Sequence, residues 1–277
     1  MTQNILVLLL LLSPLIFILT AISSWFQPGK RPQFMKKLSL VASLTSLVIA
    51  TLSSIVVFQY GALETPTYGI YGLGFGLSLL MFGMIALLSF IVVRFSLNYL
   101  DGDARQGVFL GRLAATIASV QLLVLAGNLA LLFLAWVLTS MTLHRLLVFY
   151  RERPGAIIAA RKKFIVARLG DLSLLAAIVA LFQQFNTGNL EIIFQGIKDA
   201  QESGLSLSAL GTAGIFLALA AILKSAQFPT HGWLIEVMET PTPVSAMLHA
   251  GLLNAGPFLI IRMAFVMEAS TAASMLL

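Results

Sequence analysis

Long uninterrupted runs of apolar residues, separated by short polar stretches, dominate the hydrophobic pattern of this chain. Three runs, Ile5–Phe26, Leu38–Tyr60 and Gly72–Val93, reach the length of about 20 residues that a helix needs to cross a ~30 Å hydrocarbon layer. A fourth run, Val108–Val148, is long enough for two crossings. The pattern therefore predicts an all-α, polytopic membrane protein.

The complete pattern predicts eight membrane-spanning helices. We expect them at residues 5–26, 38–60, 70–93, 108–126, 128–149, 164–184, 205–239 and 243–267. The first run lacks the positive start of a signal peptide and is longer than its usual apolar core, so we interpret it as a retained helix. This divides the chain into a three-helix region (1–105), a second region (106–268) and a short tail (269–277).

Composition supports this class and excludes several kinds of chemistry. The chain is 59% hydrophobic and only 10% charged, whereas soluble domains carry about 25% charged residues. It has no cysteine, which excludes disulfides, iron–sulfur clusters and thiol nucleophiles. No glycine-rich phosphate loop and no nucleophile elbow is present. We therefore expect no cofactor and no enzyme activity of the chain by itself.

The basic residues predict an orientation. Most of them gather in three stretches, 30–37, 94–112 and 145–168, which follow the first, third and fifth predicted spans. Because cytoplasmic loops are enriched in Lys and Arg, the N-terminus is expected outside a cell membrane. This membrane topology explains the net charge of +6, so no nucleic-acid partner is needed to account for it. An anionic-lipid patch at Arg161–Lys163 is the less favoured alternative.

One polar interruption, "KSAQFPTHGWLIEVMETPTPVSAMLHAG" at residues 224–251, stands out within the apolar pattern. A single helix over 205–239 would be about 52 Å long, so we expect a break, and Pro229 would free the carbonyl of Ser225. A lysine in a discontinuous helix resembles the ion sites of transporters. We favour such a role for Lys224 over a side chain that snorkels to the membrane surface.

Other ionisable residues of the predicted spans are ambiguous. Within the eighth span, Pro257 would disturb the helix one turn beyond His249, which suits a proton relay, although a lone helix histidine is more often a packing residue. Arg168 and Asp171 share a helix face, as a structural clamp or as pathway elements. Glu236 is a candidate gate at the cytoplasmic mouth of a proton path. It lies five residues after His231, so the two side chains do not closely share a helix face, and no metal site is predicted.

The quoted stretch resembles the signature of the proton-translocating, antiporter-like membrane subunits. This family includes subunit L (subunit 5) of NADH–quinone oxidoreductase, the large Mrp antiporter subunit and the membrane subunit of DAB-type inorganic carbon complexes. The segments "FIVARLGDLSLL" and "LAGNLALLFLAW" resemble further motifs of the same family, so the similarity covers roughly residues 110–265. The run "HRLLVFYRERPGAIIAARKKFIVARLGD" is most similar to the DAB subunit.

The resemblance implies a fold and a set of roles. It implies inverted five-helix repeats, the first of which would run from the fourth to the eighth span and hold a proton half-channel. Lys224 maps to the lysine of the broken seventh helix, His249 to the eighth-helix histidine, and Arg168 with Asp171 to the sixth-helix pair.

The sequence departs from the family pattern in two ways. Respiratory members carry a glutamate after the fifth-helix tryptophan as the partner of the lysine, and here Val137 follows Trp136. Asp171 or Glu236 would have to substitute for it. Only one repeat is present, so we expect a fragment, a naturally short subunit, or a partner chain that supplies the second repeat.

Three functions are compatible with these features. The favoured one is a cation-translocating subunit, with the proton as the expected ion, that energises inorganic carbon uptake by a large peripheral zinc-binding partner with carbonic-anhydrase-like chemistry. The second is a proton pump subunit of a respiratory or Mrp-type Na⁺/H⁺ complex, and in the respiratory case it would form part of an oxidoreductase. The third is a non-conducting membrane scaffold.

Overall fold

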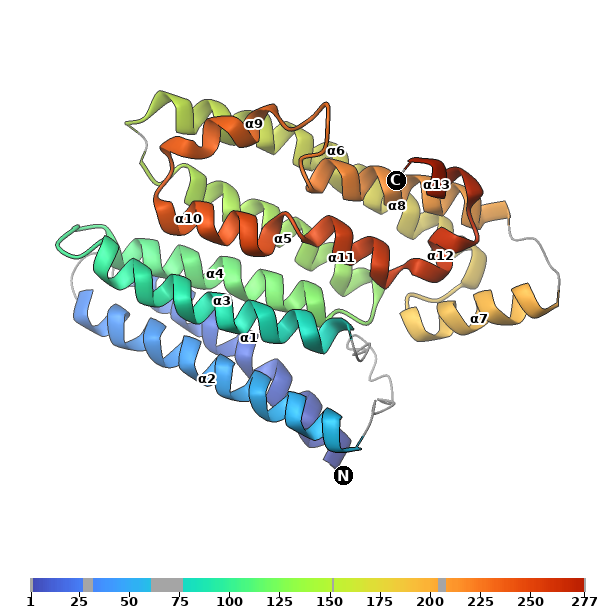
Figure 1. Cartoon of the computed structure of the whole chain (residues 1–277), viewed down its shortest axis with the longest axis horizontal. Helices are drawn as coiled ribbons and strands as arrows, with labels where there is room; N and C mark the ends of the chain where they lie inside the picture. The colour runs from blue at the N-terminus through green and yellow to red at the C-terminus, as the bar shows by residue number, and fades with distance from the viewer. Residues whose placement is uncertain (1, 27–31, 61–76, 151, 204–207, 277) are drawn as a thin grey trace.

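The computed structural model describes residues 2–26, 32–60, 77–150, 152–203 and 208–276 (Figure 1). Residues 70–76 and 205–207 of the expected spans, and the basic residues 30, 31 and 151, lie outside this part. The elements are α1 (Thr2–Phe26), α2 (Pro32–Tyr60), α3 (Leu77–Tyr99), α4 (Gln106–Leu125), α5 (Leu129–Leu147), α6 (Pro154–Phe185), α7 (Leu190–Glu202), α8 (Ser208–Lys224), α9 (Gly232–Ile235), the 3-10 helix η1 (Glu236–Glu239), α10 (Thr242–Met247), the π-helix η2 (Leu248–Leu252), α11 (Ala255–Arg262), α12 (Ala264–Glu268) and α13 (Thr271–Leu276).

The described chain is a bundle of helices without strands, which confirms the all-α, polytopic prediction. Within the described residues, six helices, α1 to α6, are long and apolar enough to cross a membrane. The seventh and eighth expected spans are instead chains of shorter helices, because α8 ends at Lys224 and η2 separates α10 from α11. Pro257 lies in the first turn of α11, where a missing N–H is tolerated.

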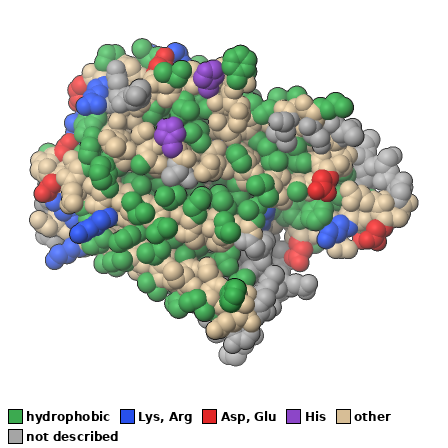
Figure 2. Space-filling view, viewed as in Figure 1, with side chains coloured by type: hydrophobic (Ala, Val, Ile, Leu, Met, Phe, Trp, Pro, Cys, Tyr) green, Lys and Arg blue, Asp and Glu red, His purple; other side chains and the backbone are tan. Residues whose placement is uncertain are grey.

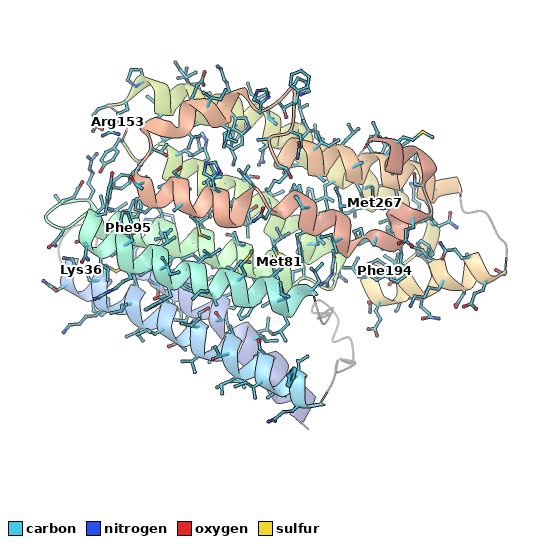
Figure 3. All side chains as sticks on the ribbon, in the orientation of Figure 1. Lys36, Met81, Phe95, Arg153, Phe194 and Met267 are labelled. Carbon is cyan, nitrogen blue, oxygen red and sulfur yellow. The ribbon has the colours of Figure 1, made fainter. Side chains whose placement is uncertain are left out.

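The bundle has two distinct ends (Figures 1 and 3). One end carries the α3–α4 and α5–α6 connections, and Figure 3 labels Lys36 and Arg153 there. We call it the basic end. Phe194 and Met267 mark the opposite end. In the space-filling view, hydrophobic side chains cover the surface between the ends, while most charged side chains lie toward them (Figure 2).

The opposite end is organised by two capped helix starts. The side chain of Asn128 accepts a hydrogen bond from the N–H of Ala130 and begins α5, and Asn189 does the same for Glu191 in α7. The two caps are joined by an isolated bridge between Asn128 and Asn189. The sequence interpretation missed α7, although its buried residues recur at helical spacing, as Leu190, Ile193, Ile197 and Ala200.

The sixth helix begins earlier than expected. We predicted a start at residue 164, but α6 begins at Pro154 and extends for 32 residues. Proline suits this first position, because the first N–H groups of a helix have no intrahelical partner. The stretch Arg161–Lys163 is therefore helical and does not form a loop. Arg161 and Lys162 are exposed, whereas Lys163 is buried.

Candidate functional site

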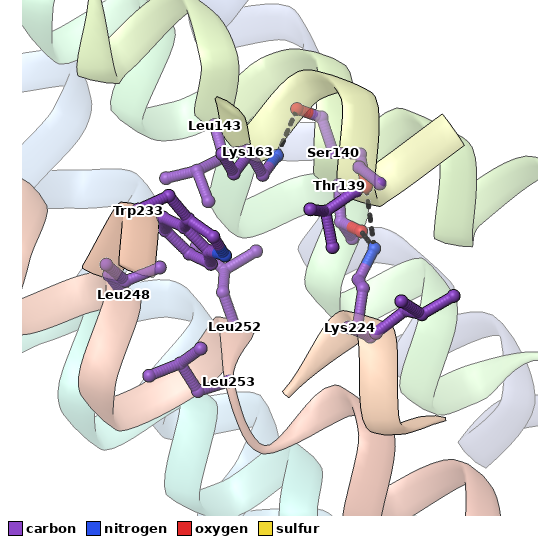
Figure 4. A pocket seen from close by; sticks show the side chains of 12 residues that line it. Thr139, Ser140, Leu143, Lys163, Lys224, Trp233, Leu248, Leu252 and Leu253 are labelled. Carbon is purple, nitrogen blue, oxygen red and sulfur yellow. Dashed lines mark hydrogen bonds between the residues drawn. The ribbon is translucent and has the colours of Figure 1, made fainter. Parts of the chain in front are cut away.

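Lys224, at the C-terminal end of α8, lies at the centre of the candidate site (Figure 4). Its Nζ donates three hydrogen bonds, to Thr139 Oγ1 at 2.8 Å, to Ser140 Oγ at 2.8 Å and to the carbonyl oxygen of Trp136 at 3.0 Å. All three acceptors belong to α5. A lysine ammonium has three donors, so these three oxygens satisfy the group away from water.

The helix break positions this amine. Helix α8 has 17 residues and is about 26 Å long, so it enters from the opposite end and stops within the bundle. The chain leaves the helix at Ser225, and Ala226 adopts a left-handed conformation with φ 53°. Helix α8 therefore ends five residues before Pro229, so Ser225 already lies outside the helix. A cation at a helix C-terminus is stabilised by the helix dipole.

Trp136 and Val137 show what surrounds the lysine in place of a glutamate. The Lys224 ammonium lies 4.4 Å from the centroid of the Trp136 ring, within the range of a cation–π interaction. The ion pairs of the described residues do not include one with Lys224. Neutral oxygens and an aromatic face thus replace the carboxylate of the respiratory subunits as the direct partners of the amine.

The carboxylate of Asp171 interacts electrostatically with Lys224. It lies on α6 and is 6% exposed, and its direct ion-pair partner is Arg168, whose Nη2 is 2.7 Å from Asp171 Oδ2. Lys224 and Asp171 interact electrostatically without direct contact. Asp171 is one of the two residues considered as substitutes for the missing glutamate. It therefore lies near Lys224 without contacting the amine directly.

Glu236 lies elsewhere, at the basic end. Its Oε1 is 2.5 Å from the Nζ of Lys162, and this pair is partly exposed. Glu236 is therefore engaged by another lysine, and the alternative in which it is the direct partner of Lys224 is wrong. Its position at the basic end still fits the expected mouth of a pathway.

His249 does not join Lys224 within the described chain. It lies in the π-helix η2 with an exposed side chain, whereas its neighbours Leu248 and Leu252 line a cavity beside the lysine. π-Helical turns occur frequently at functional sites. The site thus contains the predicted Lys224, Arg168 and Asp171, and His249 faces away from it.

The sequence interpretation missed Lys163, Thr139 and Ser140. Lys163 is 6% exposed, and its Nζ donates to the carbonyl oxygen of Ser140 at 2.8 Å. The only sequence signal is spacing, since Lys163 precedes Arg168 by five residues and Asp171 by eight, which places Lys163 and Asp171 two helical turns apart. Both lysines border a cavity of about 20 Å³, which is enough for one water molecule.

Comparisons with known proteins identify related membrane subunits. Residues 126–277 match the family described as NADH:quinone oxidoreductase/Mrp antiporter, transmembrane. The chain is 44% identical over 202 residues to the probable inorganic carbon transporter subunit DabB2 of Halothiobacillus neapolitanus, which covers 73% of this chain and 36% of that protein. It is 36% identical to Na(+)/H(+) antiporter subunit A1 of Staphylococcus aureus, over 70% of this chain and 24% of the relative.

The fold is also found in a solved assembly. The structure of the Mrp complex from Dietzia sp. DQ12-45-1b contains a chain that superposes with a TM-score of 0.75 at 23% identity, over 97% of this chain and 29% of that one. This similarity shows the shared helical architecture. The chain spans about a third of the length of the carbon transporter relative and about a quarter of the antiporter relative.

Proposed function

Since this chain belongs to the NADH:quinone oxidoreductase/Mrp antiporter transmembrane family, we propose that it is the proton-translocating membrane subunit of an inorganic carbon accumulation complex. The observation that carries the proton-translocating role is the Lys224 site. A partly buried amine with three neutral acceptors, at the end of a broken helix, can bind and release a proton inside the membrane.

The link to inorganic carbon comes from the similarity to a DabB subunit, which at 44% identity exceeds that to the antiporter subunit at 36%. The subunit would energise a large peripheral zinc-binding partner that hydrates CO₂. The membrane subunit would supply proton movement and no chemistry of its own. Its N-terminus would lie outside the cell membrane, with the basic end in the cytoplasm.

The exposed side chain of His249 is available for contact with a further protein segment. A histidine that shuttles protons needs a polar neighbour, and the described residues leave its side chain exposed. We place a second repeat, from a longer chain or a partner chain, against the surface formed by η2. His249 would then connect the two repeats.

Proton flux tests the role of Lys224. In the complex purified with its partners and reconstituted into liposomes, Lys224→Ala should lower proton flux at least about tenfold, since a positioned proton-transfer group contributes ~10²–10⁴-fold. Lys37→Ala is the matched control, because Lys37 is exposed at the basic end. Unchanged flux in both Lys224→Ala and His249→Ala, with the complex intact, would instead establish a non-conducting scaffold.

A second candidate function is a subunit of an Mrp-type Na⁺/H⁺ antiporter, favoured by the 36% identity to such a subunit. Purification from mild detergent separates the two. A large peripheral protein that contains zinc, measured by metal analysis, supports the carbon complex. Several small antiporter subunits, or peripheral redox subunits, would overturn it.

A further inference from the structure

Lys163 is a second lysine beside the cavity, and its burial demands an explanation. It lies nine residues after the first residue of α6, about 14 Å along the helix from the basic end. The carbonyl oxygen of Ser140 is its acceptor at 2.8 Å. Ionisable side chains inside membrane helices are costly and generally mark pathways for ions or protons.

Ser140 connects the two amines. Its hydroxyl oxygen accepts a hydrogen bond from Lys224 and its carbonyl oxygen accepts one from Lys163, both at 2.8 Å (Figure 4). The cavity of about 20 Å³ borders both lysines and Trp233. The indole N–H of Trp233 is buried and has no hydrogen-bond partner among the described residues. One water molecule in this cavity would have polar groups on several sides.

The surrounding charges disfavour two protonated lysines at once. The charged groups that act on Lys163 are Lys224 on α8 and Asp171 and Arg168 on its own helix. With both amines charged, three cations would share a single carboxylate in a water-poor environment, which is costly. One proton shared by the two lysines leaves the net charge of the site unchanged as it moves between them.

His144 extends this arrangement toward the basic end. It lies on α5 one turn beyond Ser140, and only three residues before the last residue of the helix, Leu147. Its side chain is half-buried, and its Nδ1 is buried without a hydrogen-bond partner among the described residues. The charged groups that act on it are Lys163 and Arg168 on α6.

We propose that Lys163 and His144 form a second proton-carrying site, through which protons pass between Lys224 and the basic end along the α5–α6 interface. This route rests on the proposed function of Lys224. It adds the path that protons take within the bundle, between Lys224 and the basic end. It differs from a route through His249, which lies on an exposed surface of η2. A water molecule in the cavity, beside the hydroxyl group of Ser140, would be the connection that carries the proton between the two amines.

The test measures proton flux against pH in the reconstituted complex, for Lys163→Gln, His144→Gln and the controls Arg161→Gln and Lys37→Ala. Lys163→Gln should lower flux about tenfold or more, within the range of a lost proton-transfer group. His144→Gln should flatten the dependence of flux on pH between about 5 and 8, where histidine titrates. Substitution of the exposed Arg161, two residues before Lys163, should leave the pH profile unchanged.

The outcomes separate this inference from the proposed function. Loss of flux in Lys224→Ala, with normal flux and pH profile in both Lys163→Gln and His144→Gln, would overturn the second site and leave the function of Lys224 standing. Normal flux in Lys224→Ala would overturn the proposed function itself. If Lys163→Gln fails to assemble, His144→Gln decides the question, because a purely structural histidine would not shift the pH profile.

Discussion

Lys224 shows how a partly buried charge is accommodated when the glutamate partner of the respiratory subunits is missing. Position 137 holds valine, and the lysine instead uses two hydroxyl groups and a carbonyl oxygen from the same helix, with Asp171 further away. Neutral acceptors solvate the ammonium without fixing its charge state. Such a lysine can lose its proton without leaving an unpaired carboxylate in direct contact.

Thr139 provides a test of this solvation. Thr139→Val keeps the shape of the side chain but removes the hydroxyl that accepts from Lys224 at 2.8 Å. The free energy of unfolding should fall by about 1–3 kcal/mol, since a buried donor is left without its partner, and proton flux should fall with it. Thermal unfolding in detergent and the liposome assay measure the two effects.

Thr212→Val is the matched control for this change. Within the described chain its hydroxyl donates to the carbonyl oxygen of Ala209 in its own helix, and its side chain is exposed. Equal stability and flux in the two valine variants would show that the hydroxyl of Thr139 does not support Lys224.

Helix α8, which carries Lys224, is held close to α11 by a glycine. Gly256 in α11 faces α8, where a Cβ would lie 2.5 Å from the carbonyl oxygen of Ala221 and would also contact the hydroxyl of Ser225. Ala221 lies in the final turn of α8, and Ser225 directly follows Lys224. The crossing of these two helices therefore sets the position at which α8 ends.

Gly256→Ala should separate the two helices. The added methyl meets backbone, which cannot rotate away, so the free energy of unfolding should fall by about 1–3 kcal/mol. Gly211→Ala, in α8 with no atom within 4 Å of the added Cβ, should keep or raise stability, because alanine favours a helix by about 0.5–1 kcal/mol. Equal melting temperatures of the two variants, measured in detergent, would contradict the tight crossing.

The whole molecule is polarised between its basic end and the end that carries α7. The α5–α6 route would open at the basic end, near the Lys162–Glu236 pair, whereas α8 enters from the opposite side. The orientation of the bundle in the membrane therefore decides from which compartment Lys163 and His144 exchange protons.

The lack of native cysteine makes this orientation measurable. Gln201→Cys, exposed in α7, should react with a membrane-impermeant maleimide in intact cells. Ala104→Cys, exposed at the basic end, should react only after permeabilisation, because loops rich in Lys and Arg stay in the cytoplasm. The cysteine-free parent supplies the background, and the reverse labelling pattern would place the N-terminus inside.

The sequence by itself determined the class of the protein and the long spans, and it singled out Lys224 as a candidate site residue. Apolar length decides whether a helix can cross hydrocarbon, and a lysine within an apolar segment is visible in any linear pattern. Arg168 and Asp171 were visible for the same reason.

Only the tertiary structure decided which polar groups meet. Lys163 belongs to a basic run, and a run does not show which of three adjacent side chains points inward, because the helix rotates about 100° per residue. Ser140 and Lys224 are 84 residues apart, so no local pattern predicts their contact. For His249 the motif predicted a place in the same half-channel as Lys224. The packing of η2 instead leaves its side chain exposed.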